Sequence, residues 1–238
     1  MFIDCRGQGR TCNMLIRDLC GYFISKHGVN IKYQNHHNLQ KILGHLVPVF
    51  TFEPNGSQLA TEEDVNDCLQ GNIRCSLSFL NIYCQTGPVA KFIYENYKSP
   101  IVNEPIDEIF IHVRLGDVQH GNRTPDLHYY QKILGDTNKQ INITSDSPNH
   151  SLIQQLTKQY NVKMYNGSEI DTLFEASKYK TVILSLGTFS WMMGLVASKS
   201  KKFYPDPSEY TIWHGPIFEQ TDWFCVSRTN DMIHTHLH

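Results

Sequence analysis

The second half of the chain alternates short apolar runs with segments whose apolar residues recur at helical spacing. This pattern predicts strands at 108–113, 140–145, 162–165, 181–184 and 202–204. Between them it predicts helices at 127–134, 152–160, 170–178 and 189–197. Apolar strands joined by helices form a parallel sheet that is covered on both faces, so this half is predicted to be a Rossmann-like α/β domain.

The first half begins with a similar unit but then loses a clear pattern. The pattern predicts a strand, a helix and a second strand at 1–5, 14–27 and 29–33. Gly28 stands where a helix C-terminus favours glycine. Beyond this unit only two helices are predicted, at 62–69 and 89–97. The first half is therefore expected to be a less regular α/β domain.

A stretch with two prolines separates the halves. Residues 99–105 have no strand or helix periodicity, which is typical of a linker. We therefore predict two domains, residues 1–106 and residues 107–238, with a C-terminal tail that could pack back on the first.

Charge and cysteine content narrow the class of protein. Lys and Arg number 21 against 23 Asp and Glu, so no overall basic field exists to hold a nucleic acid. The seven cysteines are odd in number and include no C-x-x-C pair, which favours buried thiols in a reducing compartment over disulfides or zinc. With neither a signal peptide nor a membrane-spanning apolar run, we expect a cytoplasmic protein unless the chain was excised from a longer one.

The loop after the first predicted strand nearly matches the dinucleotide fingerprint G-x-G-x-x-G. Cys12 replaces the third glycine, and the acid expected about 20 residues on is missing. Three interpretations stay open: a dinucleotide site, a tight turn that needs glycine, and a loop whose amides and Arg10 meet a phosphate or sugar. The P-loop pattern is absent, so a P-loop phosphotransferase is excluded.

Polar residues follow two strands at the edge where parallel sheets bind ligands. His112 and Arg114 end the first strand. The planar guanidinium group of an arginine can donate two hydrogen bonds at once to the oxygens of a diphosphate. Alternatively, Arg114 pairs with Asp117 and stabilises a turn. Asp146 follows the second strand and could accept hydrogen bonds from the N1–H and amine of guanine, or cap the next helix through an Asx-turn.

A third strand leads into an apolar helix through small hydroxyl residues. The amides at such a helix start can bind an anion, whereas the alternative is that Ser185 or Thr188 caps the helix. Because Arg114 and the start of this helix would lie at neighbouring strand ends, both could bind the same diphosphate. The twelve histidines are scattered and no D-x-D motif occurs, so we expect no metal.

Four motifs in this order resemble the superfamily of α-1,2-, α-1,6- and protein O-fucosyltransferases, which use GDP-fucose. The motifs are G-R-x-x-N at 9–13, H-x-R-x-G-D at 112–117, T-S-D-S at 144–147 and S-L-G-T-F-S-W at 185–191. The α-1,2-fucosyltransferase family is the most similar, and the resemblance covers residues 1–28 and 108–205. Cys12 and Leu115 depart from it, standing where the family usually has glycine and a second arginine.

The resemblance implies a GT-B-like α/β fold of two Rossmann-like domains, each with a parallel sheet. The first domain would lie on the acceptor side, and residues 107–238 would bind the nucleotide sugar. It also implies a metal-independent, inverting transfer of L-fucose from GDP-fucose to a glycan hydroxyl. A donor with another GDP- or UDP-linked sugar such as rhamnose, and a non-catalytic nucleotide- or glycan-binding module, stay open as alternatives.

The resemblance also implies roles for single residues. Arg114 would hold the β-phosphate, and His112 and Asp146 would face the guanine. The remaining donor-binding residues would be Ser185, Thr188, Phe189 and Ser190 around the diphosphate, with Gly9, Arg10 and Asn13 from the first domain. An acceptor hydroxyl also needs a general base, for which Asp117 is our first candidate.

Overall fold

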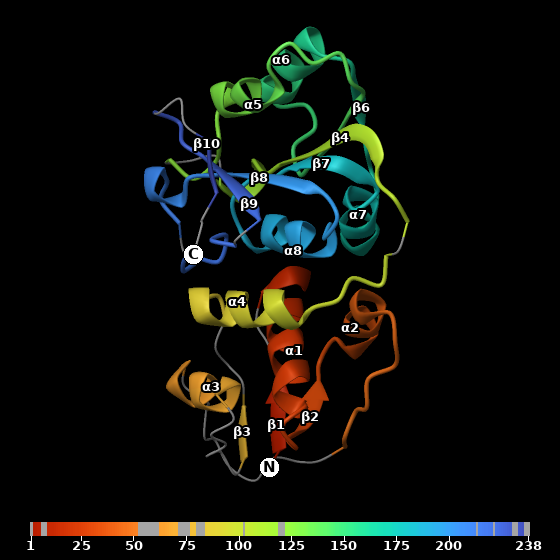
Figure 1. Cartoon of the computed structure of the whole chain (residues 1–238), viewed down its shortest axis with the longest axis vertical. Coiled ribbons are helices and arrows are strands. Elements are labelled where there is room, and N and C mark those ends of the chain that lie inside the picture. Colours follow the sequence, from red (N-terminus) through yellow and green to blue (C-terminus); the bar gives the residue numbers. More distant parts are fainter. Residues whose placement is uncertain are drawn as a thin grey trace. The chain divides into compact units, whose positions relative to one another are not determined.

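The computed structural model describes most of the chain in two compact units, Met1–Pro100 and Ile101–His238 (Figure 1). The described residues are 2–5, 9–51, 62–70, 77–79, 84–101, 103–118, 122–212, 214–220, 222–229 and 233–235. The units divide after Pro100, whereas the sequence placed the boundary after residue 106. Strand β4 (Ile106–Val113) begins before the expected position, and its first residue already pairs with Tyr179 of the second unit.

The first unit contains a small parallel sheet with the order β2-β1-β3 among its described residues. Its strands are β1 (Phe2–Cys5), β2 (Asn30–Tyr33) and β3 (Leu77–Phe79). Its helices are α1 (Thr11–Ser25), α2 (His36–Leu43), α3 (Glu62–Leu69) and α4 (Gly87–Asn96). The β1–α1–β2 unit is the one that the sequence predicted, and α3 has the predicted bounds.

Helix α1 is the central helix of this unit and contacts α2, α4 and β2. Eleven of its fifteen residues are buried, which agrees with a helix that is apolar on more than one face. Two of the buried residues, Arg17 and Asp18, are charged. After α1 the chain turns through Gly28, whose φ of +83° lies in the left-handed region that glycine adopts without strain.

The second unit is built on a larger sheet. Among the described residues its order is β10-β9-β8-β7-β4-β5-β6, and every neighbouring pair is parallel except β10 and β9. The strands that follow β4 are β5 (Ile141–Ser145), β6 (Val162–Met164), β7 (Tyr179–Ile183), β8 (Lys201–Pro205), β9 (Trp223–Val226) and β10 (Ile233–Thr235). The last two come from the tail, so this part of it extends the second sheet.

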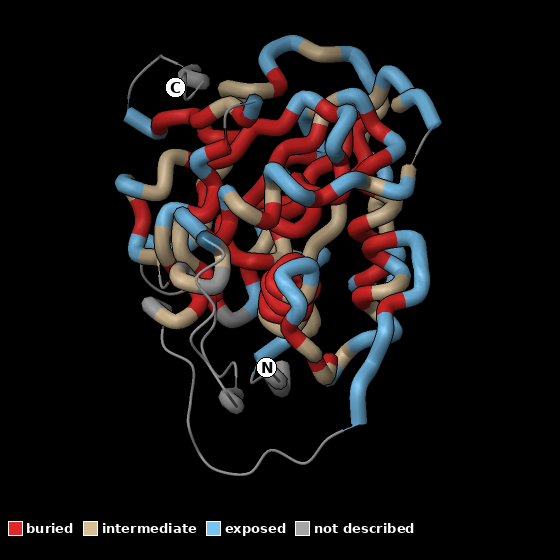
Figure 2. The backbone as a smooth tube through the Cα atoms, turned by 60° about the horizontal axis from the view of Figure 1, so that its bottom comes forward, coloured by how far each residue is buried: buried red, intermediate tan, exposed pale blue. Residues whose placement is uncertain are grey.

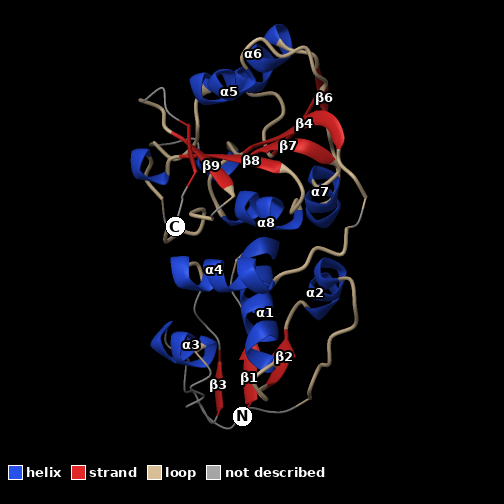
Figure 3. Ribbon diagram, viewed as in Figure 1, coloured by secondary structure: helices blue, strands red, loops and turns tan. Residues whose placement is uncertain are grey.

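Helices cover both faces of the second sheet (Figures 1 and 3). One face carries α5 (Leu127–Leu134) and α6 (Ser151–Gln159), and the other carries α7 (Glu169–Ala176) and α8 (Thr188–Val196). Short 3₁₀ turns, η1 (Gly116–Val118) and η2 (Pro207–Glu209), follow β4 and β8. More than half of the residues of β4, β5, β7 and β8 are buried, as expected for a doubly covered sheet. Figure 2 shows the buried segments of the described chain in red.

Residues of β4 alternate between the two faces of the sheet. Ile109, Ile111 and Val113 belong to a core cluster with Tyr129 and Leu152 under α5 and α6. Phe110 faces the other way and packs its ring against those of Tyr165 and Tyr179, with centroids 5.8 and 5.2 Å apart. By this alternation His112 faces the side that carries α8.

The predicted fold class is confirmed: the chain is α/β, with two Rossmann-like units that each contain a parallel sheet. The predicted elements of the second half are all present, with bounds shifted by three residues or fewer. Helix α2 and strands β3, β9 and β10 were not predicted. No helix in the described part of the chain is long and apolar enough to cross a membrane.

Asp18 offers a stability test of the first unit. Both of its carboxylate oxygens are buried, and within the described structure neither has a hydrogen-bond partner of normal geometry. Burial raises the pKa of Asp18 from 3.8 to about 7, although the Arg17 charge and the Asn35 backbone oppose the shift. The folded state therefore binds a proton that the unfolded state has lost, and the free energy of unfolding should fall as pH rises from about 4 to 7.

We predict that Asp18→Asn removes this pH dependence. The variant should unfold with a free energy on the order of 3 kcal/mol higher than the native chain at pH 8, and the difference should vanish near pH 4. Urea titrations at several pH values measure it. A difference that does not change with pH would contradict the assignment.

Candidate functional site

The candidate site lies at the carboxyl ends of β4, β5 and β7. The strand order reverses between β4 and β7, which are direct neighbours with Ile111 opposite Ile183. On the other side of β4, Val113 lies opposite Ser145 of β5. Ligands of such sheets bind at this reversal point, beyond the carboxyl ends of the strands. The three loops that the sequence singled out therefore do meet at one edge.

Ser190 joins β4, β7 and α8 through hydrogen bonds. Its Oγ accepts a hydrogen bond of 3.1 Å from the amide of Ser185, which follows β7. The same oxygen lies 2.5 Å from Nδ1 of His112. We assign this short contact as a hydrogen bond from the Ser190 hydroxyl to Nδ1, so that the hydrogen of the neutral imidazole is on Nε2.

His112 is held in its neutral form. Its side chain is buried, and burial lowers its pKa from 6.5 to about 4. The Arg114 charge also lowers this pKa, whereas the Asp146 charge raises it, so both charges lie near the ring. The ring of Phe189 packs against it at a tilt of 57°, with centroids 4.9 Å apart. The charges of Arg114 and Asp146 and the ring of Phe189, all predicted site residues, therefore lie near the His112 ring.

The peptide group between Arg114 and Leu115, in the loop after β4, is held by two hydrogen bonds. The hydroxyl of Thr124 donates a hydrogen bond of 2.6 Å to the backbone oxygen of Arg114. The next amide, that of Leu115, donates one of 2.8 Å to Oδ1 of Asp146. The carboxylate of Asp146 thus positions this loop. The expected alternative, in which Asp146 caps the following helix, is wrong because His150 is the N-cap of α6.

The start of α8 has the form of an anion site. Gly187, with a φ of +97°, is its N-cap and has no side chain to occupy the first amides of the helix. Neither Ser185 nor Thr188 is the N-cap, so the alternative prediction that one of them caps α8 is wrong. Thr188 is the first residue of the helix.

Ser185 differs from the other predicted residues of this loop. Its hydroxyl is fully buried beside the phenol of Tyr130, although without a hydrogen bond of normal geometry in the described structure. Because Tyr130 belongs to α5, this side chain points to the face opposite His112 and α8. The Ser185 amide, rather than its hydroxyl, takes part in the His112 cluster.

Three predicted residues of the first-unit loop, Gly9, Arg10 and Asn13, lie within the described part of the chain. Gly9 has a φ of +106°, and a Cβ added there would lie 2.6 Å from Nδ2 of Asn13. Gln85, before α4, donates a hydrogen bond of 3.2 Å to Oδ1 of Asn13. Arg10 is the N-cap of α1 and is exposed. The contact of Gly9, Arg10 and Asn13 with a donor stays a prediction.

The general base is not identified by the structure. The backbone of Asp117 lies in η1, but its side chain lies outside the described residues. The described residues include no group of three or more His, Cys, Asp or Glu side chains that could hold a metal ion, and the metal-independent reaction stays a prediction.

His214 is a buried residue near Arg114 that the sequence analysis did not name. Its Nδ1 donates a hydrogen bond of 2.8 Å to the backbone oxygen of Gly215. Burial lowers its pKa, and the Arg114 charge adds to the shift, so the histidine lies near Arg114. His214 follows β8 in the C-terminal tail, where the sequence contains no motif that predicted a site residue.

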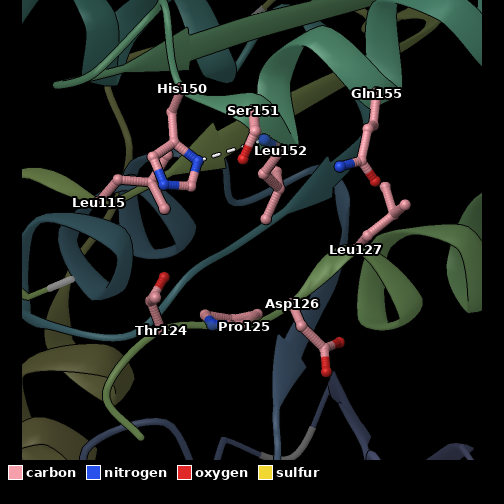
Figure 4. Close-up of a pocket in the computed structure, with 9 residues that line it drawn as sticks. All are labelled: Leu115, Thr124, Pro125, Asp126, Leu127, His150, Ser151, Leu152 and Gln155. Carbon is pink, nitrogen blue, oxygen red and sulfur yellow. Dashed lines mark hydrogen bonds between the residues drawn. The ribbon is translucent and has the colours of Figure 1, made fainter. Parts of the chain in front are cut away.

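A cavity of about 270 Å³ opens beside the same edge, on the face of α5 and α6. Its lining residues come from the β4–α5 loop, the first turn of α5 and the start of α6 (Figure 4). They are Leu115, Thr124, Pro125, Asp126, Leu127, His150, Ser151, Leu152 and Gln155. The sequence analysis named none of them as a binding residue.

Comparisons with known proteins assign no family. No family of known proteins matches the chain, and no curated protein matches it. One solved structure, described as E. coli heptosyltransferase WaaC with ADP-2-deoxy-2-fluoro heptose, is similar with a TM-score of 0.45 and 9% identity, over 90% of this chain and 92% of that chain. A TM-score of 0.45 at 9% identity is too low for the activity of that protein to be inferred for this chain.

The buried His112 predicts an acid-sensitive second unit. Since the folded state resists protonation of His112, the free energy of unfolding should fall by roughly 3 kcal/mol as pH decreases from 6.5 to 4. His112→Asn cannot take up this proton, so its stability should change less over the same range. Denaturant titrations of both proteins compare the two slopes, and equal slopes would show that another group is responsible.

Gly116 is predicted to be required for the Asp146 contact. A Cβ at Gly116 would lie 2.7 Å from Oδ2 of Asp146, whose other oxygen is held by Leu115. Gly116→Ala should therefore cost about 1–3 kcal/mol of stability. In the double variant with Asp146→Ala the added cost should be much smaller, because the clash is removed. Additive costs in thermal unfolding would refute this contact.

Proposed function

We propose that the chain is a glycosyltransferase that moves a 6-deoxyhexose, L-fucose from GDP-fucose in the first instance, onto a glycan hydroxyl. The transfer is inverting and metal-independent. One observation carries the proposal: Arg114 and the start of α8 follow two neighbouring parallel strands at the point where the sheet order reverses. The choice of GDP-fucose rests on the motif resemblance.

Charge explains what these groups would do. As the bond between the sugar and the diphosphate breaks, negative charge grows on the β-phosphate and positive charge on the sugar ring. The Arg114 guanidinium and the first amides of α8, a helix of nine residues, would stabilise that leaving group. Both groups are positioned before the ligand arrives, so little reorganisation is needed during the reaction.

The neighbours of Arg114 support this role. Thr124 and Asp146 hold the peptide group that follows Arg114, and Ser190 holds His112 two residues before it. His112 is neutral and His214 has a lowered pKa, so neither adds a competing positive charge at neutral pH. Among His112, Arg114 and His214, the positive charge at neutral pH is therefore on Arg114.

We predict that Arg114→Ala lowers the rate of sugar transfer by roughly 10²–10³, the usual cost of removing a charge-matched donor at a developing oxyanion. Arg114→Lys should recover only part of the rate, because a lysine lacks the planar fork. Mass spectrometry of products from GDP-fucose with a mixture of glycan acceptors measures the transfer.

Arg123→Ala is the matched control. Arg123 is exposed in the same β4–α5 loop and has no proposed role, so its removal should leave transfer unchanged. Undiminished transfer by Arg114→Ala would refute the proposal. Donor binding by the native chain without hydrolysis or transfer would instead identify a non-catalytic nucleotide-binding module.

A further inference from the structure

The cavity beside β4 has aliphatic walls. Leu115, Pro125, Leu127 and Leu152 line it from the β4–α5 loop and the two helices (Figure 4). With a volume of about 270 Å³ it has room for a flat ring system. Aliphatic walls suit the apolar faces of such a ring, and polar groups at the edge then decide which ring is accepted.

His150 and Gln155 can donate hydrogen bonds into this cavity, and the hydroxyl of Ser151 can donate or accept there. Nδ1 of His150 accepts a hydrogen bond of 3.2 Å from the amide of Leu152, so the hydrogen of the neutral ring is on Nε2. In Figure 4 the His150 ring and the amide nitrogen of Gln155 project towards the space between the lining residues. His150 is the N-cap of α6, where the helix dipole also favours an acceptor atom, and Gln155 lies in the second turn of the helix.

The carboxylate among the lining residues, that of Asp126, bonds to groups outside the cavity. Asp126 caps α5 by accepting from the Tyr129 amide at 3.2 Å, and it forms an ion pair with Nε of Arg228 at 3.2 Å. Figure 4 shows its carboxylate turned away from the other lining side chains. The Asp126 carboxylate therefore does not compete with His150 and Gln155, whose donors suit a ring with acceptor atoms on its edge.

We propose that this cavity holds the base of the donor nucleotide, with His150 and Gln155 donating to acceptors on the edge of guanine. Guanine presents O6 and N7 as neighbouring acceptors, whereas adenine presents an amine beside N7. This inference rests on the proposed function and changes one part of the expectation from sequence. His112 and Asp146, which were expected to face the base, already bond to Ser190 and Leu115.

The cavity is coupled to the proposed phosphate site through the backbone. Leu115 follows Arg114 directly, and Thr124 in the cavity wall donates its hydroxyl hydrogen to the Arg114 carbonyl. A nucleotide with its diphosphate at Arg114 and α8 would thus cross the carboxyl end of β4 and place its base on the α5–α6 face.

Calorimetric titration of the full chain with GDP, IDP and ADP tests the position of the base. IDP has the O6 and N7 acceptors of guanine but lacks the exocyclic amine. Donation from His150 and Gln155 predicts equal affinity for GDP and IDP, and affinity for ADP about tenfold or more weaker. If Asp146 recognised the base instead, the missing amine would weaken IDP, and this result would overturn the inference.

Two variants test the donors separately. His150→Asn keeps a residue that can cap α6 but removes the Nε2 donor, and Gln155→Ala removes the amide. Each should lower the affinity for GDP roughly three- to tenfold and change that for ADP little, so that selectivity decreases. Gln154→Ala is the control, since Gln154 bonds to the Asn149 backbone and does not line the cavity. Thermal unfolding of each variant checks that it is folded.

The outcomes separate this inference from the proposed function. If GDP binds and Arg114→Ala weakens it, but His150→Asn and Gln155→Ala leave its selectivity over ADP intact, only the base position is refuted. If the native chain binds no nucleoside diphosphate, the proposed function fails and the inference fails with it.

Discussion

The buried hydroxyl of Ser190 is the contact on which the arrangement of the site depends. It links the histidine at the end of β4, the amide after β7 and the first turn of α8. These bonds lie in a dry interior, where a hydrogen bond is stronger than in water and an unmet one is costly. They fix the start of α8 relative to β4, and burial in the same place lowers the pKa of His112, two residues before Arg114.

A second set of contacts holds the loop that carries Arg114. The hydroxyl of Thr124 donates a hydrogen bond to the Arg114 carbonyl, and the amide of Leu115 donates one to the Asp146 carboxylate. Gly116 has no side chain, which leaves room for this carboxylate. The peptide group between Arg114 and Leu115 is therefore positioned by two side chains from outside β4. Electrostatic stabilisation of a leaving group needs such positioning, because donors that must first reorganise lose much of their effect.

The carboxyl end of β4 separates two chemical environments. On the α8 face lie His112, Phe189 and Ser190, beside a buried helix start whose N-cap, Gly187, provides no side-chain cap. On the α5–α6 face lies a cavity with aliphatic walls and the donors of His150 and Gln155. A nucleotide has the same division into a charged diphosphate and a flat base, so one ligand can match both faces across a single strand end.

The sequence by itself determined the α/β class, most of the second unit and the edge at which Arg114, Asp146 and the α8 start gather. Apolar periodicity is a local signal, and parallel strands bring their following loops to one edge. It did not reveal β3, β9 and β10, short strands whose pairing is set by distant neighbours, nor the polar helix α2. Only the tertiary structure decided that Ser185 points towards Tyr130, that His214 approaches Arg114 and that His150 borders a cavity. These depend on the face a side chain takes and on contacts between residues far apart in the chain, which no local pattern encodes.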